Sequence, residues 1–431
     1  MSEISDKLKQ LLGNRSLMTG AEFVRKREAV EQRRRAGDFE IDKFVPGEVV
    51  ENEAGRVYLV RHEFPLETRQ GGIEIGAVLE SIPEHIALTA CDTDLEEFNP
   101  ATACFIDTET TGLAGGTGTV PFLIGVGYFD GGVFRLEQGF MRDYDEEEAM
   151  LRYLSGIFAR CQTVVTFNGK SFDVPLLRTR YISNRLPFRL DAALHFDLIH
   201  AVRRIWKLRL KDCSLNNVER AVLGLERHGD VPSAEIPQIW FDYLRSRDAQ
   251  PLKRVFYHHR MDVLSLVALT ALLSQRMDIP CGEGFEHAED RLSVIMLHFR
   301  RKRYEDAIEH AHKLLEAETE DVVRHQCLEL LAYACKRMQN WRGMAEVWEQ
   351  IVREFPSEIL GRLELAKFYE HRMRNLPAAQ KVCEEAIQYL ETRAALEVAD
   401  EFESLQIRAF QNRVDRLRRR LSKGAMNNNG L

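Results

Sequence analysis

The order of strand-like and helix-like runs between residues 103 and 276 restricts the fold more than any other feature. Five apolar runs have the character of strands: 104–107, 121–129, 132–141, 163–169 and 194–199. An amphipathic helix is expected over 145–160, another from about Ser171, and residues 200–276 are mostly helical. Three strands, helix, strand, helix and strand is the order of an α/β domain around a mixed five-stranded sheet. We place this domain at 96–278.

Helical segments recur with a weak period after about residue 285, where no strand pattern remains. Three of them carry a large residue at matching places, 37 and 35 positions apart: Tyr304, Trp341 and Leu376. Each is followed three positions later by a smaller or flexible residue: Ala307, Met344 and Ala379. The period resembles that of tetratricopeptide repeats, which we expect over 285–395. A plain antiparallel helical bundle is the alternative.

Both ends of the chain are polar and rich in arginine. Residues 1–95 are expected to form an arm of exposed helices and short strands, with a strand at 55–62. A basic cluster lies in the first 45 residues and favours a solvated helix over a phosphate-binding arm: Arg25, Lys26, Arg27, Arg33, Arg34 and Arg35. Residues 396–431 are expected to form a basic helix with a disordered tail.

Composition limits the partners of the chain. Its net charge is −8, from 59 basic and 67 acidic residues, whereas proteins that coat nucleic acid are usually basic. Nucleic-acid binding is therefore expected to be local. Because the sequence has neither a long apolar run nor a secretion signal, we expect a cytoplasmic protein without membrane contact. Its eight cysteines form no C-x-x-C pair, which favours reduced buried thiols over disulfides or zinc.

Two carboxylates end the first strand of the α/β region. Asp107 and Glu109 are separated by one residue, so their side chains point to the same face of the strand, about 6–7 Å apart along it. Acids so close to a buried strand repel one another unless a cation lies between them. The adjoining run Thr110-Thr111-Gly112 would allow backbone amides to approach a ligand. Exposed acids at a strand end are the alternative.

Two later segments each carry one more acid. Asn168 ends a buried strand, and Asp173 follows in the first turn of the next helix, where an acid also favours the helix dipole. On a later helix, His258 and Asp262 are four residues apart and share a face, and His259 lies close to it. Tyr257 points away if the helix already extends that far.

Taken in order, these three segments resemble the DEDD (DnaQ-like) exonuclease superfamily on the ribonuclease-H-like fold. The runs IDTETTGLAGGTGTVPFLIGVG and SLNNVERAVLGLERHGDVPSAEIP are similar to the YprB-type ribonuclease-H-like domain. The resemblance covers about 100–276. It implies a hydrolase that cleaves phosphodiester bonds of single-stranded nucleic acid, RNA or DNA, from a 3′ end.

The resemblance also implies roles for individual residues. Two Mg²⁺ or Mn²⁺ ions would be held by the four acids: Asp107, Glu109, Asp173 and Asp262. His258 would be the general base. Four residues would border the terminal nucleotide: Thr110, Gly112, Leu113 and Asn168. The sequence departs from the two familiar subgroups, because one has His five residues before the last Asp and the other has Tyr four before it. Here His258 is four before and Tyr257 five before, which leaves the base open.

Other functions were weighed against the exonuclease. A catalytically quiet nucleic-acid-binding or scaffold protein, working on a protein partner through its helical repeats, is the main alternative. A helical structural protein would require the three segments to coincide by chance. The glycines at 112, 115, 116 and 118 are not followed by G-K-[ST] or by a helix, which argues against nucleoside-triphosphate and dinucleotide sites.

Overall fold

A computed structural model describes Arg25, Glu28 and residues 40–112, 118–317, 319–395 and 401–428, with side chains only at 405–422 in the last range. Apart from Arg25 and Glu28, the first 39 residues of the expected N-terminal arm, and with them most of the basic cluster, lie outside these residues. The chain divides into two compact units. One comprises Met1–Ile86, Asp94–His200 and Ser214–Leu272, and the other comprises Ala87–Thr93, Ala201–Cys213 and Leu273–Leu431.

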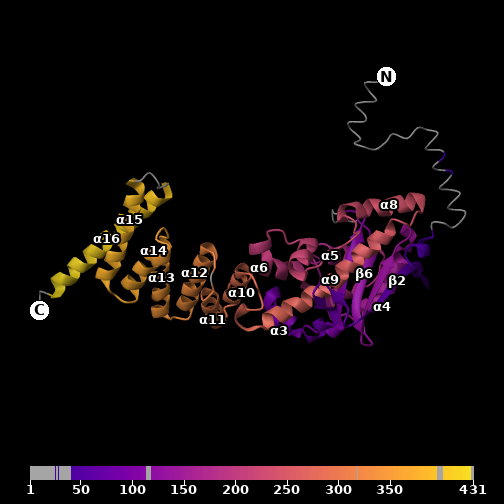
Figure 1. Cartoon of the computed structure of the whole chain (residues 1–431), viewed down its shortest axis with the longest axis horizontal. Helices are drawn as coiled ribbons and strands as arrows, with labels where there is room; N and C mark the ends of the chain where they lie inside the picture. The colour runs from indigo at the N-terminus through magenta and orange to yellow at the C-terminus, as the bar shows by residue number, and fades with distance from the viewer. Residues whose placement is uncertain are drawn as a thin grey trace, which may run out of the picture. The chain divides into compact units, whose positions relative to one another are not determined.

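A mixed seven-stranded sheet forms the centre of the first unit, with strand order β1-β2-β7-β6-β5-β8-β9. Two of its strands, β2 and β6, are labelled in Figure 1. The strands are β1 (Glu48–Asn52), β2 (Gly55–Pro65), β5 (Ala103–Thr110), β6 (Pro121–Asp130), β7 (Val133–Phe140), β8 (Thr163–Thr166) and β9 (Leu194–Asp197). A separate hairpin consists of β3 (Arg69–Gln70) and β4 (Ile73–Glu74). Only the pairs β5–β8 and β8–β9 are parallel. All five expected strands are confirmed.

The sheet nevertheless has two strands more than the five that the sequence predicts. The run at 55–62 is a strand, but it continues to Pro65 and pairs antiparallel with β7, from Tyr58 opposite Phe140 to Pro65 opposite Val133. β1 then pairs with β2 as a hairpin. Residues 57–60 are fully buried in the core of the sheet. A strand buried on both faces extends a sheet rather than forming an arm, which is why β1 and β2 belong with β5–β9.

Helices alternate with the strands along the chain in the expected order. They are α3 (Pro83–Ala90), α4 (Glu147–Phe158), α5 (Asp173–Ser183), α6 (Leu198–Leu210), α7 (Leu215–Val218), α8 (Ile236–Ser246) and α9 (Leu252–Asp278). Trp240 of α8 stacks on Phe122 of β6 with ring centroids 4.9 Å apart. Gly131 and Gly132 connect β6 to β7 and both have positive φ, the backbone of a tight hairpin turn. In the described part of the chain, no helix combines the length and apolar character needed to cross a membrane.

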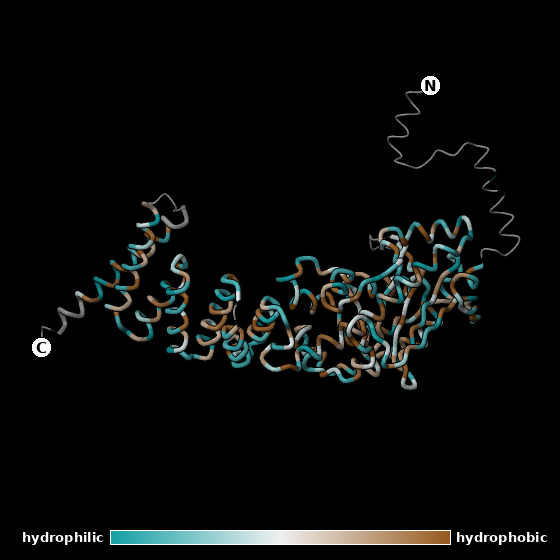
Figure 2. The backbone as a smooth tube through the Cα atoms, in the orientation of Figure 1, coloured by the Kyte–Doolittle hydropathy of each residue, from teal (hydrophilic) through white to brown (hydrophobic). Residues whose placement is uncertain are grey.

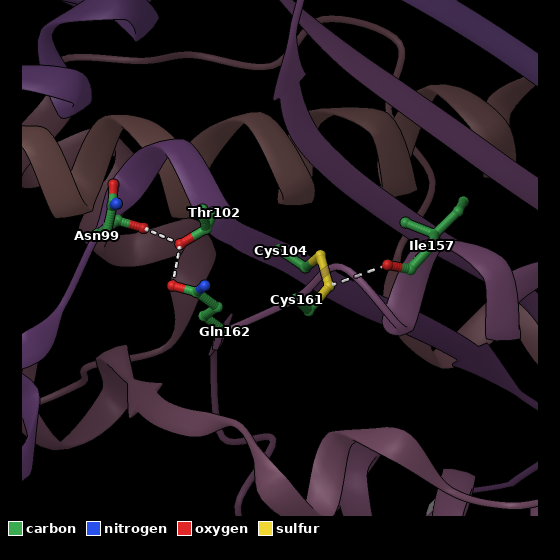
Figure 3. Close-up of a disulfide and its surroundings, with 6 residues drawn as sticks. All are labelled: Asn99, Thr102, Cys104, Ile157, Cys161 and Gln162. Atoms are coloured by element: carbon green, nitrogen blue, oxygen red, sulfur yellow. Dashed lines mark hydrogen bonds between the residues drawn. A yellow bond between two sulfur atoms is a disulfide. The ribbon is translucent and has the colours of Figure 1, made fainter.

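A disulfide joins Cys104 of β5 to Cys161, which precedes β8 (Figure 3). The prediction that all cysteines are reduced is therefore wrong for this pair, whereas the other six are free thiols. The two cysteines are 57 residues apart, but parallel pairing of β5 with β8 brings their Cα atoms to 5.7 Å. Beside them, the backbone N–H of Gln162 donates to the carbonyl of Thr102. Local sequence spacing could not reveal a contact that the sheet creates.

In the described residues of the C-terminal part, seven helices follow one another, and Figure 1 labels them α10 to α16. They are α10 (Ala288–Arg300), α11 (Tyr304–Leu315), α12 (Asp321–Arg337), α13 (Trp341–Glu354), α14 (Leu360–His371), α15 (Leu376–Ala395) and α16 (Glu401–Asn428). The three residues at matching places in the sequence are the first residues of α11, α13 and α15. Hydrophobic and hydrophilic stretches alternate along these helices (Figure 2), and the three positions that follow by three residues are buried: Ala307, Met344 and Ala379. Repeated helical hairpins are thus present at the expected spacing.

The basic helix α16 turns several of its arginines toward other residues of the same unit. Three of them contact the carboxylate of Glu370, whose side chain is 1% exposed. Arg413 and Arg420 each have a nitrogen at 2.7 Å and Arg416 at 2.8 Å from its oxygens. These cations neutralise a buried acid on α14, so they are not a free basic surface.

Candidate functional site

β5 carries the first two acids in the middle of the sheet, between antiparallel β6 and parallel β8. The side chains of Asp107 and Glu109 are 20% and 13% exposed. Alternation along the strand gives these two residues a common face, as expected. The pairing with β6 becomes irregular after Glu109, so the strand ends immediately beyond the two carboxylates.

The loop between β8 and α5 places Asp173 beside this pair. Asp197, at the end of β9, accepts hydrogen bonds from the backbone N–H groups of Asn168 (2.7 Å) and Lys170 (2.9 Å). These bonds hold Asn168 at φ +69°, a left-handed conformation that asparagine tolerates. The chain can then begin α5 at Asp173, whose carboxylate accepts a bond from the hydroxyl of Thr108 on β5 at 2.5 Å.

α9 contributes the remaining acid together with a histidine. His258 and Asp262 are one turn apart, and Nε2 of His258 lies 3.3 Å from Oδ2 of Asp262. The same nitrogen is 3.9 Å from Oε1 of Glu109. One ligand atom from each of Glu109, His258 and Asp262 lies within 4.8 Å of the other two, a spacing that could hold a metal ion.

The charges in this cluster are unfavourable without a cation. Burial raises the pKa of Asp107 well above its ordinary value, and the charges of Asp262 and Asp173 raise it further. Burial and the charge of Asp107 do the same to the pKa of Glu109. The pKa of Asp173 is raised to about 6, chiefly by burial and against the hydrogen bond from Thr108. The charges of all four expected acids therefore act on one another, whereas among the described residues only Glu109 and Asp262, together with His258, place ligand atoms within 4.8 Å of one another.

A buried arginine reaches the cluster from the loop that follows Gly224. Arg227 has a 4% exposed side chain, and its guanidinium contacts carboxylate oxygens of both Glu219 and Asp262. Burial opposes its charge, but the acids around it outweigh this effect and raise the pKa of Arg227. Arg227 and Glu219 were not assigned from the sequence. They lie in the run SLNNVERAVLGLERHGDVPSAEIP, whose charged residues were the available signal.

Asp230, in the same run, orients His258 and was also missed. Its two carboxylate oxygens are both 2.9 Å from Nδ1 of His258. An N–H at Nδ1 can be shared between them, and this leaves Nε2 as the proton acceptor facing Glu109 and Asp262. Ser233 lies 3.3 Å from the same Nε2. A carboxylate that fixes the tautomer and direction of an imidazole is the usual support for a reactive or metal-binding histidine.

His259 has a structural position instead. Its Nδ1 is 3.0 Å from Nε2 of Gln138, which can only donate, so Nδ1 accepts and Nε2 donates to the carbonyl of Asp107 at 3.0 Å. Burial lowers the pKa of His259 to about 4, which leaves it neutral at pH 7. A Cβ atom at Gly125 would lie 2.6 Å from Cε1 of this ring, so the glycine on β6 makes room for it.

The remaining candidates lie at the edge of the group or away from it. Thr110 donates its hydroxyl hydrogen to the carbonyl of Gly112 at 2.9 Å, and no atom of the described residues would lie within 4 Å of a Cβ at Gly112. Asn168 lies in the loop that supports Asp173. Leu113 falls outside the described residues. Because α9 already begins at Leu252, Tyr257 points away from the acids, as expected, and its ring lies 5.5 Å from the guanidinium of Arg260.

The donor set fits hard divalent cations. Carboxylate oxygens dominate it, imidazole is compatible with them, and none of the described cysteines belongs to the group. The raised pKa values of Asp107 and Glu109 report the cost of gathering negative charge without enough positive charge. Mg²⁺ or Mn²⁺ would remove that cost.

Comparison with known proteins identifies the family of the chain. Residues 104–274 match the RNase H superfamily. The chain is 30% identical over 366 residues to protein YprB of Bacillus subtilis (strain 168), which covers 84% of this chain and 85% of that protein. The matched superfamily region contains the four acids, His258 and the segment with Arg227 and Asp230. The chain therefore belongs to the family of YprB, and its strand-rich part is a domain of the RNase H superfamily.

Proposed function

We propose that this protein is a metal-dependent exonuclease that hydrolyses single-stranded nucleic acid from its 3′ end. One observation carries the proposal: four acids from β5, α5 and α9 converge beside His258, and burial and mutual repulsion raise the pKa of Asp107, Glu109 and Asp173. If these acids had a purely structural role, we would expect each of them to be paired with a cation. Gathering unneutralised acids costs stability, which suits a site that is completed by cations.

The four acids would hold two Mg²⁺ or Mn²⁺ ions, whose charge would activate the attacking water and stabilise the leaving 3′ oxygen. Asp230 would keep Nε2 of His258 free to take a proton from the attacking water. The water oxygen forms a bond to phosphorus, the bond from phosphorus to the 3′ oxygen breaks, and the leaving oxygen takes a proton from solvent. The products are a nucleoside 5′-monophosphate and a strand shortened by one nucleotide.

The geometry favours His258 over Tyr257 as the base. His258 faces Glu109 and Asp262, whereas Tyr257 lies on another side of α9. For the terminal nucleotide we keep Thr110, Gly112, Leu113 and Asn168 as proposed contacts. The first two continue the chain directly from Glu109, and Asn168 lies in the loop that supports Asp173.

A degradation assay tests the activity and its direction together. Single-stranded RNA and DNA, labelled at either end, are incubated with the full chain and Mg²⁺ or Mn²⁺. We expect a 5′-labelled strand to shorten in single-nucleotide steps, and a 3′-phosphorothioate linkage to slow the reaction. Release of nucleotides from the 5′ end would contradict the direction. No cleavage of any strand by folded protein with either metal would contradict the activity.

A catalytically quiet scaffold is the second candidate, and Arg227 favours it. Its guanidinium already neutralises Asp262, one of the four acids. Calorimetric titration with Mn²⁺ distinguishes the two functions. The exonuclease requires binding that is weakened by at least about tenfold in Asp262→Ala. Absence of binding, or binding that is equal in wild type and variant, would favour the scaffold.

A further inference from the structure

A cavity lies on another side of α9 from the four acids. It has a volume of about 470 Å³, within the range of about 300–1,000 Å³ that is typical of small-molecule sites. Its walls come from the segment 44–46, from β2, from residues 228 and 229, and from the first two turns of α9. All of these belong to the first compact unit.

Positive charge dominates this cavity, although the chain as a whole is acidic. Four cationic side chains line it: Arg61, Lys253, Arg254 and Arg260. None of its described lining residues is acidic. Arg61 is paired with Glu48 and Glu137, so the remaining three supply the excess charge. Arg254 donates to the carbonyls of Gly229 (3.1 Å) and Asp230, which neutralise no charge.

Aromatic rings are interleaved with these cations. Phe44 and Tyr257 are half-buried in the wall, and the guanidinium of Arg260 lies 5.5 Å from the centre of the Tyr257 ring. Positions 253, 257 and 260 are spaced i, i+4 and i+7, so one stripe of α9 presents a cation, a ring and a cation. His258 and Asp262 form the neighbouring stripe of α9, which faces the other acids of the candidate site.

We propose that this cavity binds a nucleotide, with its phosphate against Lys253, Arg254 and Arg260 and its base against Tyr257. Rings next to cations suit an anion that carries an aromatic base, because bases stack on side-chain rings and phosphates take hydrogen bonds from arginine and lysine. The nucleotide can come from two sources, a unit of a bound strand or a free mononucleotide. The strand source rests on the proposed function, whereas the free mononucleotide does not.

A hydrogen bond connects the lining of the cavity to the candidate active site. The carbonyl of Asp230 accepts the bond from Arg254, and the carboxylate of the same residue holds His258. A strand whose end reaches the four acids could thus place another of its nucleotides only a few residues away along α9. This arrangement would give a net-acidic protein the local attachment point for nucleic acid that its composition requires.

The test measures binding in EDTA, so that no strand is cleaved and failure of hydrolysis does not affect it. AMP, inorganic phosphate and a fluorescent ten-nucleotide single strand are titrated into the full chain. The variant is Lys253→Ala/Arg260→Ala. The matched control, Arg342→Ala/Lys381→Ala, removes the same charge from side chains that are 91% and 79% exposed in the C-terminal helices.

We expect AMP or the strand to bind at least about tenfold more weakly to the variant than to the control. If the strand loses affinity, the site holds a unit of the strand; if only AMP does, it holds a free mononucleotide. Tyr257→Leu should weaken the same ligand by about fivefold or more and leave inorganic phosphate unchanged. Equal affinities in variant and control would overturn the proposal. So would phosphate binding as tightly as AMP, or no effect of Tyr257→Leu.

Discussion

Buried carboxylates occur in both parts of the molecule, but their surroundings are opposite. In the strand-rich unit, burial and neighbouring acids raise the pKa of Asp107 and Glu109 well above their ordinary values. In the helical unit, burial also opposes the charge of Glu370, but hydrogen bonds from Arg416 and other cations outweigh it and lower the pKa. Glu364 follows the same pattern with Lys336 and Lys367, whose Nζ atoms are 2.6 and 2.7 Å from its oxygens.

The comparison separates two uses of a buried acid. An acid that the fold supplies with cations joins helices, and its charge is satisfied as soon as the chain folds. An acid that the fold leaves short of positive charge lowers stability until something else provides that charge. Because the two kinds occur in one chain, each is an internal reference for the other.

The strongest test of this difference is Asp107→Asn. Replacing one carboxylate of the coupled group should lower nuclease activity by more than about 100-fold, since even residues that merely support metal ligands are worth about 10–100-fold. Without metal, the variant should unfold at an equal or higher temperature, because repulsion is relieved. Asp242→Asn, at a side chain that is 62% exposed, is the control. Loss of stability in Asp107→Asn would place Asp107 with the structural acids.

A smaller effect is expected from Asp230→Asn, which removes the carboxylate that orients His258. Activity should fall by about 10–100-fold, and the pH–rate profile should change shape because the imidazole loses its charged partner. A purely structural role would lower stability and leave that profile intact. Measuring kcat/KM between pH 6 and 9 beside thermal unfolding separates the two results.

The structural acid gives the opposite result. Glu370→Gln should leave activity on short strands unchanged and should destabilise the helical unit by about 2 kcal/mol, because Arg413, Arg416 and Arg420 lose a buried partner. Glu384→Gln is the matched control, since Glu384 pairs with one arginine and its side chain is 43% exposed. That change should cost less than about 0.5 kcal/mol. Equal losses in urea unfolding would remove the distinction between buried and exposed pairs.

The subtlest prediction concerns pH, where the two acids should show opposite signs. The folded-state pKa of Asp107 is raised above 3.8, so its ionisation costs stability that grows as pH rises through that pKa. The gain from Asp107→Asn should thus be largest near pH 8 and fade toward pH 4. The pKa of Glu370 is lowered below 4.5, so the loss in Glu370→Gln should be complete at neutral pH and fade in acid. Urea unfolding in EDTA measures both pH dependences, each of which should change the free energy of unfolding by about 1 kcal/mol. If the effects of the two substitutions changed with pH in the same direction, the comparison would be contradicted.

Much of the fold and part of the site could be predicted because the signals are local. The period of two places Asp107 and Glu109 on one face, and the period of a helix places His258 beside Asp262. The matching residues Tyr304, Trp341 and Leu376 begin three helices for the same reason: each repeat carries its own start signal.

The rest depends on contacts between distant segments. β2 could be identified as a strand, but its pairing with β7 links residues that are 68 to 82 positions apart, from Pro65 with Val133 to Tyr58 with Phe140. Arg227 and Asp230 reach His258 and Asp262 from a loop about 30 positions earlier, and no spacing rule relates them. Only the folded chain shows that Gly125 makes room for His259 or that Cys104 meets Cys161.

Because of the disulfide, the strand-rich unit stays covalently connected after a single peptide-bond cleavage inside the loop that the disulfide closes. Cys104 lies three residues before Asp107, and Cys161 lies two residues before β8, so the closed loop encloses β6, β7 and α4. A protease that cuts once between 105 and 160 would therefore leave two fragments that still travel as one molecule. They should migrate as a single band without reductant and separate into two with it, and Cys161→Ser should abolish the difference.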